Sequence, residues 1–79
     1  MTDVVLRHIV MRSLPANPKT KRWQVVTKAE GALLGSIGWF GRWRRYAFTP
    51  YEGSVYEQDC LRDIASFIEA QTKAHREAA

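Results

Sequence analysis

Cysteine is nearly absent from this 79-residue chain, in which Cys60 is the only one. A disulfide within the chain and a zinc site built from four thiolates are therefore both excluded. Histidine is almost as scarce, because His8 and His75 are the only two and neither has an aspartate or glutamate beside it at the spacing of a metal site. We therefore expect neither a metal nor a cofactor.

Long apolar runs are missing as well. No stretch approaches the ~18 residues that a membrane-spanning helix requires. The first ten residues also lack the basic, apolar and small-residue regions of a signal peptide. Together with the single cysteine, these absences predict a protein of the reducing cytoplasm that does not associate with a membrane.

Arrangements typical of catalysis are also lacking. Asp59 and Asp63 fall on one face of an expected helix, but Arg62 and Lys73 share that face, which is typical of a solvated charged surface. Cys60 falls on the apolar side of the same helix, where a cysteine is usually a small buried side chain. No nucleophile, base and orienting group occur together, so we expect no enzyme.

What the sequence does hold is positive charge, placed unevenly. It carries 12 Lys and Arg against 8 Asp and Glu, a net charge of +4. Residues 1–51 hold nine of the basic and two of the acidic residues, whereas residues 52–79 hold three and six. The basic part of such a dipolar chain steers it towards polyanions.

Aromatic and arginine side chains are concentrated in one segment. Six of the nine aromatic residues lie between Trp39 and Tyr51, interleaved with Arg42, Arg44 and Arg45. Aromatic faces and guanidinium groups together stack, donate hydrogen bonds and attract anions. This segment is the candidate binding region, and a nucleic acid or an acidic protein is the first partner to consider.

The hydrophobic pattern predicts a single α+β domain, a three- to four-stranded antiparallel β-meander with one C-terminal helix packed on one face. We expect a strand within residues 1–12 and a basic, proline-containing linker over 13–22. The β-meander is expected over 23–50, where the period is two. Whether residues 1–12 join the sheet is left open.

The expected helix follows the meander. Ser54 and Glu57 have the spacing of a capping box, which predicts a helix over 54–75, followed by a frayed tail over 76–79. The apolar stripe of this helix should dock on the sheet, because a lone helix with such a stripe is unstable in water.

Strand alternation divides the candidate binding region between two faces. Tyr46 and Phe48 fall on the side expected to face the helix, whereas Lys28, Phe40 and Arg45 fall on the outer side. The full set of expected partner-binding residues adds nearby arginines and the basic side chains of the linker: Lys28, Phe40, Arg42, Arg44, Arg45, Lys19, Lys21 and Arg22. A merely solvated sheet face would have the same composition, so that alternative stays open.

Four short motifs follow one another between residues 22 and 68: Trp23-x-Val25, Leu34-Gly35-x-Ile37-x-Trp39, Trp43-Arg44-x-Tyr46-x-Phe48-x-Pro50 and Cys60-Leu61-x-x-Ile64-x-x-Phe67. This order resembles a group of short bacteriophage and prophage proteins of unassigned function. The resemblance implies an accessory protein that acts by binding in the cytoplasm of the host cell, for example as an anti-CRISPR-like inhibitor of a host-defence complex.

The sequence therefore favours a protein that engages a host protein or nucleoprotein through its basic, aromatic-rich sheet half. A protein target is favoured over nucleic acid because only a few outward charges can be assigned to the sheet. The alternative is a small nucleic-acid-binding domain that uses the same face and the basic linker. A structural or assembly role through aromatic contacts is a third hypothesis, and the oligomeric state stays open.

Overall fold

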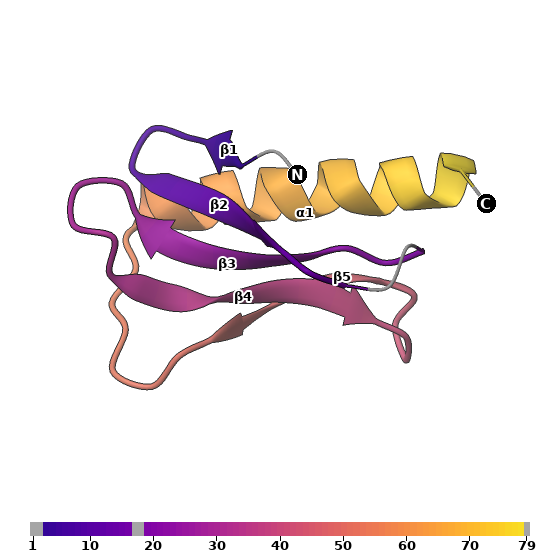
Figure 1. Ribbon diagram of the computed structural model, residues 1–79, viewed down its shortest axis with the longest axis horizontal. Coiled ribbons are helices and arrows are strands. Elements are labelled where there is room, and N and C mark those ends of the chain that lie inside the picture. Colours follow the sequence, from indigo (N-terminus) through magenta and orange to yellow (C-terminus); the bar gives the residue numbers. More distant parts are fainter. Residues whose placement is uncertain (1–2, 17–18, 79) are drawn as a thin grey trace.

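A computed structural model describes residues 3–16 and 19–78, which form a five-stranded antiparallel sheet with one helix along one face (Figure 1). The strands are neighbours in chain order, so the sheet is a meander. The elements are β1 (Val4–Val5), β2 (Ile9–Leu14), β3 (Arg22–Thr27), β4 (Leu33–Phe40), β5 (Arg45–Pro50) and α1 (Gln58–Ala78). The predicted α+β class is confirmed, but the sheet has five strands rather than three or four.

The additional strands come from the N-terminal segment, which joins the sheet as a hairpin rather than as one strand over residues 1–12. Val4 pairs with Met11, and the Leu6 amide donates to the Ile9 carbonyl across the intervening turn at 2.9 Å. The interruption of the alternating pattern at Arg7 and His8 marks this turn. Residues 1 and 2 lie outside the described ranges.

The predicted linker over 13–22 is too long, because both of its ends belong to strands. Ser13 pairs with Trp23 and Leu14 pairs with Arg22. The connection between β2 and β3 therefore covers residues 15–21, of which 17 and 18 lie outside the described ranges. Pro15 comes directly after the last ladder pair, where its missing N–H costs no sheet hydrogen bond.

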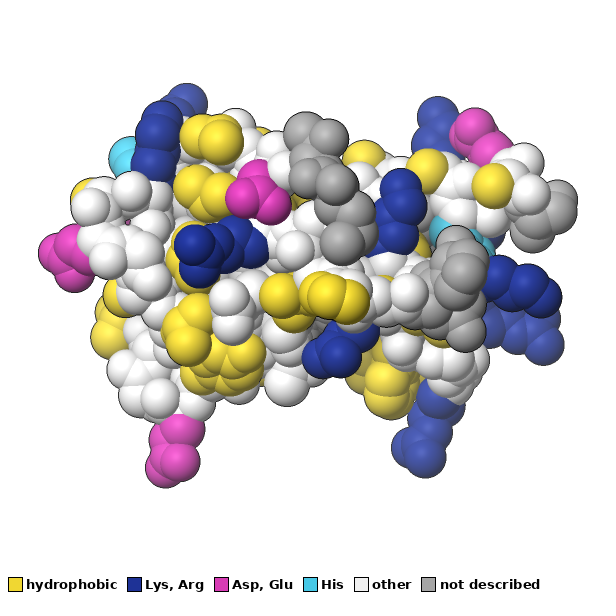
Figure 2. All heavy atoms as spheres, viewed as in Figure 1, with side chains coloured by type: hydrophobic (Ala, Val, Ile, Leu, Met, Phe, Trp, Pro, Cys, Tyr) yellow, Lys and Arg dark blue, Asp and Glu magenta, His cyan; other side chains and the backbone are white. Residues whose placement is uncertain are grey.

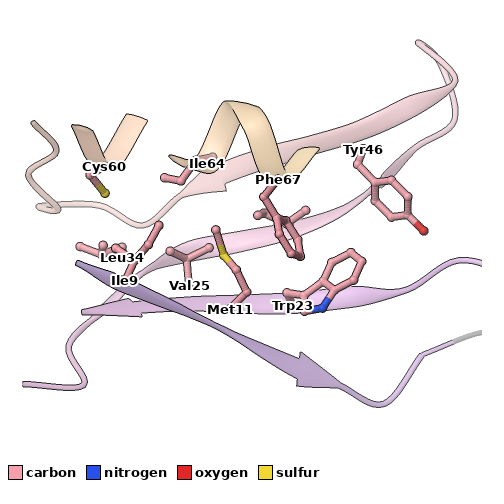
Figure 3. Packing of buried hydrophobic residues seen from close by; sticks show 10 residues of the cluster. Ile9, Met11, Trp23, Val25, Leu34, Tyr46, Cys60, Ile64 and Phe67 are labelled. Carbon is pink, nitrogen blue, oxygen red and sulfur yellow. The ribbon is translucent and has the colours of Figure 1, made fainter. Parts of the chain in front are cut away.

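The core lies between the sheet and α1. Ile9, Met11, Val25 and Ile37 are almost fully buried on the sheet side. The helix contributes three buried apolar side chains to this core, Cys60, Ile64 and Phe67, which point towards the sheet in Figure 3. The predicted docking of the apolar helix stripe is thus confirmed.

A β-bulge in β4 brings two consecutive residues to the core side. Val25 pairs with Gly35 but Val26 pairs with Leu33, so Leu34 is the extra residue. Position 35 has no room for a side chain, because a Cβ there would lie 2.6 Å from the ring of Phe48. Only glycine fits where β5 crosses this closely.

The helix begins and ends later than the sequence predicts. Ser54 is not its N-cap, since Ser54 lies in a turn and donates its amide to the Tyr51 carbonyl. Glu57 is the N-cap instead: its carboxylate accepts hydrogen bonds from the amides of Asp59 and Cys60, and its carbonyl accepts the first helical bond, from Leu61. The helix then continues to Ala78, so residues 76–78 are helical rather than a frayed tail.

Candidate binding surface

Three basic segments that are distant in the sequence meet at one end of the molecule. In an antiparallel meander every second connection lies at the same end, which places the β2–β3 connection beside the β4–β5 turn (Figure 1). The C-terminal half of α1 ends there too, because the Tyr46 amide donates to Thr72 Oγ1 at 3.0 Å. We call this the basic end.

Most of the positive charge of the protein lies at the basic end. Eight of the 12 lysines and arginines lie in its three segments or at the first residue of the strand that follows one of them: Lys19, Lys21, Arg22, Arg42, Arg44, Arg45, Lys73 and Arg76. Only two of the 8 acidic residues, Glu69 and Glu77, accompany them. Figure 2 shows dark blue side chains crowding the right-hand end, where the helix finishes.

The opposite end holds the start of the helix and most of the carboxylates. Asp59 forms ion pairs with Arg7 at 3.7 Å and with Arg62 at 3.5 Å, so the arginines of that end are partly neutralised. The dipole inferred from the two halves of the sequence therefore also exists in space, along the long axis of the molecule.

The turn that joins β4 to β5 projects the aromatic and arginine residues from the basic end. The Trp43 amide donates to the Phe40 carbonyl at 3.1 Å, and the Arg44 amide donates to the Gly41 carbonyl at 3.2 Å. Arg44 adopts a left-handed conformation with φ of 53°. The left-handed backbone conformation in this turn thus falls on an arginine, whereas glycine is the residue that adopts it without a steric cost.

Two arginines hold this turn in place, and two others are left open. Arg45 Nε donates to the Trp43 carbonyl at 3.3 Å, and Arg76 Nη2 reaches from the helix to the Arg44 carbonyl at 3.2 Å. The exposed side chains of Arg42 and Arg44 make no hydrogen bond or ion pair within residues 3–16 and 19–78. Their guanidinium groups are available to an anion.

Trp43 is the most exposed aromatic side chain that the structure describes. It is 61% exposed and packs edge to face on Phe40, which is 37% exposed, with ring centroids 4.6 Å apart. Such a pair fixes the orientation of the indole and leaves much of its surface in water.

The outer face of β4 and β5 continues from this pair as a shallow hollow of about 170 Å³. Its floor is made of small residues on adjacent strands, with Phe40 and Arg22 also among its lining: Ser36, Gly38, Ala47 and Thr49. The Arg22 stem passes beside Gly38, with its Cγ 3.9 Å from where a Cβ of residue 38 would lie. An extended ligand could approach the sheet closely here.

Two grooves border the helix at the basic end. One, of about 320 Å³, lies between β5 and α1 and is lined by Arg45, Lys73 and Arg76 among others. The other, of about 170 Å³, lies between the β2–β3 connection and α1 and is lined by Lys19, Lys21 and His75 among others. Cationic side chains thus surround the end of the helix on both sides.

Tyr46 ties the three segments together. Its hydroxyl accepts a hydrogen bond from the Lys21 amide at 3.0 Å, while its own amide donates to Thr72. Its ring contacts Trp23 and Trp39 edge to face, at centroid distances of 5.5 and 5.3 Å. Trp39 in turn stacks on His75 in the last turn of the helix, with centroids 4.1 Å apart.

The structure brings together seven of the eight residues expected to bind a partner. Lys28 is the exception: it lies in the β3–β4 loop at the opposite end, where its amide donates to the His8 carbonyl at 2.9 Å. Trp43 is absent from the expected set, although alternation places it on the same outer side as Arg45; in the structure it lies in the β4–β5 turn, outside the strands. The expected set also omits Lys73 and Arg76. Basic residues near the C-terminus of a helix complement its dipole, so the sequence gives no signal that these two belong to a binding surface.

Groups suited to metal or thiolate chemistry are not gathered anywhere in the described ranges. No cluster of three or more His, Cys, Asp and Glu side chains that could hold a metal ion occurs there. Burial raises the pKa of the Cys60 thiol, and the nearby Glu57 and Asp63 carboxylates raise it further, which disfavours the reactive thiolate. Within the same ranges, no helix has the length and apolar character needed to cross a membrane.

Comparison with known proteins gives one informative match. No protein-family model matches this chain, and no solved structure matches it. Over 50 residues the chain is 36% identical to an uncharacterized 9.3 kDa protein of Acholeplasma phage L2. The matched stretch covers 63% of this chain and 64% of the length of the phage protein. The chain is thus similar to a small phage protein of unassigned function.

Proposed function

We propose that this is a non-enzymatic, phage-type binding protein whose basic end binds nucleic acid through the phosphate backbone. One observation carries the proposal: eight cationic residues from three distant segments lie at one end of the molecule with only two carboxylates. Phosphates are the most abundant ligands for such a surface, and each contact releases condensed counterions.

Nucleic acid is the alternative partner in the sequence analysis, in which a protein target is favoured. The sequence favours a host protein or nucleoprotein because it assigns only two cations, Lys28 and Arg45, clearly to the outer side of the sheet. Adding the helix residues Lys73 and Arg76 to the turn and the β2–β3 connection increases the number of cations that one ligand could meet. Of the four acidic residues of the helix, Asp59 and Asp63 lie in its first half, towards the opposite end, whereas Glu69 and Glu77 lie in its second half.

The experiment is a salt titration of binding to labelled oligonucleotides, followed by fluorescence anisotropy. Two to five phosphate contacts predict a log–log slope of about −2 to −4 between affinity and salt concentration. Arg42→Glu should lower the affinity at least about tenfold and make the slope shallower. Lys28→Glu, which changes the net charge equally but at the opposite end, is the matched control and should have a much smaller effect.

Two results would refute the proposal. The first is an absence of binding at low salt to both single-stranded and duplex oligonucleotides. The second is an equal loss of affinity in Arg42→Glu and Lys28→Glu, because this would show that net charge alone governs the association.

A protein target is the second candidate, and the exposure of Trp43 against Phe40 favours it. An exposed tryptophan among arginines has the composition of an interface hot spot. Capture of a host protein that survives nuclease treatment, resists salt and is lost in Trp43→Ala would support this candidate. The narrower hypothesis of an anti-CRISPR-like inhibitor stays a prediction from the sequence resemblance.

A further inference from the structure

The β4–β5 turn presents an aromatic ring between two open cations. Trp43 is 61% exposed, and its amide is held by the Phe40 carbonyl. Arg42 and Arg44 flank it in the chain and leave their guanidinium groups without partners among the described residues. In a nucleic acid strand, each base is similarly flanked by two phosphates.

We propose that the nucleic acid bound by this protein is single-stranded, with one unpaired base stacked on Trp43 and its flanking phosphates at Arg42 and Arg44. This inference rests on the proposed function. In a duplex both faces of an internal base are covered by its neighbours, so an indole can stack only on a base that is unpaired or at an end.

The outer face of the sheet supplies a path for the rest of the strand. Beyond Phe40, the hollow floored by Ser36, Gly38, Ala47 and Thr49 extends across β4 and β5. Small side chains let a sugar-phosphate backbone approach the sheet, and the Arg22 stem that passes beside Gly38 places a cation along this path. The strand would run from the turn, past Phe40 and along the hollow.

The test compares three ligands of equal length: oligo(dT), an oligomer of abasic deoxyribose phosphates, and a blunt duplex. The first two carry the same phosphates and differ only in their bases. We expect the intact protein to bind oligo(dT) roughly 5- to 100-fold more tightly than the abasic oligomer, as one stacked base would give. Binding should also quench the exposed indole of Trp43, whereas Trp23 is buried in the core.

Variants of Trp43 test whether its indole ring causes the difference in affinity between oligo(dT) and the abasic oligomer. Trp43→Ala should remove the preference for oligo(dT) while leaving the affinity for the abasic oligomer unchanged, and Trp43→Phe should retain part of it. Tyr51→Ala is the matched control, because Tyr51 is an exposed aromatic residue in the segment that follows β5, away from the turn. Unchanged melting temperatures would show that these exposed positions do not support the fold.

The outcomes separate this inference from the proposed function. Equal binding of oligo(dT) and the abasic oligomer, unaffected by Trp43→Ala, would overturn the stacking inference and leave phosphate binding intact. Tighter binding to the blunt duplex than to oligo(dT) would overturn it as well. Failure of all three ligands to bind at low salt would refute the proposed function itself. If oligo(dT) binding is confirmed, oligo(rU) then shows whether the preferred strand is DNA or RNA.

Discussion

The hydrogen bond between Tyr46 and Thr72 fixes the basic end, and removing it provides a quantitative test. Thr72 is only 8% exposed, and its Oγ1 accepts the Tyr46 amide at 3.0 Å. The amide belongs to the edge strand β5 and points away from β4, so no other strand can satisfy it. Thr72→Val keeps the shape of the side chain and leaves a buried N–H without a partner.

The expected cost follows from that unsatisfied donor. A buried N–H that loses its partner destabilises a protein by about 1–3 kcal/mol. A domain of this size is stable by roughly 4–12 kcal/mol, so Thr72→Val should remove a large share of the free energy of unfolding. Thr72→Ser retains the acceptor and loses one methyl group, which should cost only about 1 kcal/mol.

Urea unfolding measures the free energies, and amide hydrogen exchange reports on the bond itself. The Tyr46 amide should stay protected in the wild-type protein and in Thr72→Ser, and should exchange much faster in Thr72→Val. Wild-type stability together with a protected Tyr46 amide in Thr72→Val would refute the assignment of Thr72 as the partner that satisfies β5.

Three further predictions concern single sites. Arg44→Gly should raise the free energy of unfolding by about 0.5–1 kcal/mol, because Arg44 has a φ of 53°, whereas Arg44→Ala keeps this strain and should give no gain in urea unfolding. The amides of Asp59 and Cys60 hold the pKa of the Glu57 carboxyl below its usual value. Because the pKa of Glu57 is lower in the folded than in the unfolded state, its ionised form stabilises the fold at any pH above the unfolded-state pKa. Glu57→Gln should therefore be less stable than wild type at neutral pH, and the difference should be lost as the pH falls from the unfolded-state pKa through the folded-state one. Cys60 is 6% exposed and its pKa is raised, first by burial, so a thiol reagent should modify it slowly in the native protein and rapidly in urea; rapid native modification would contradict its burial.

The helix and the main strands were predictable because their signals are local. Alternation marks Leu33–Phe40 as a strand, and the spacing of Cys60, Ile64 and Phe67 marks the docking face of the helix. The helix start was misplaced because Ser54 matches the usual cap sequence, whereas Glu57 makes the capping bonds. Which residue serves as the N-cap depends on the path of the chain before the helix, and a four-residue sequence pattern carries no information about that path.

The N-terminal hairpin was harder to predict because β1 has only two residues. A strand that short has no period to detect, and it is stabilised by pairing with β2 rather than by its own sequence. The length of the β2–β3 connection was overestimated for a related reason: Ser13 and Leu14 have no strong strand signal and pair because Trp23 and Arg22 lie opposite them.

The sequence by itself determined the α+β class, the apolar stripe of the helix, the excess of positive charge and the dense aromatic and arginine segment. Each of these is a property of residue type and local spacing. Only the tertiary structure decided which charges lie close together. It separated Lys28 from the other cations, and it brought Lys73 and Arg76 beside the β4–β5 turn. These placements depend on strand order and on where the helix crosses the sheet, which are fixed by long-range contacts such as that between Tyr46 and Thr72.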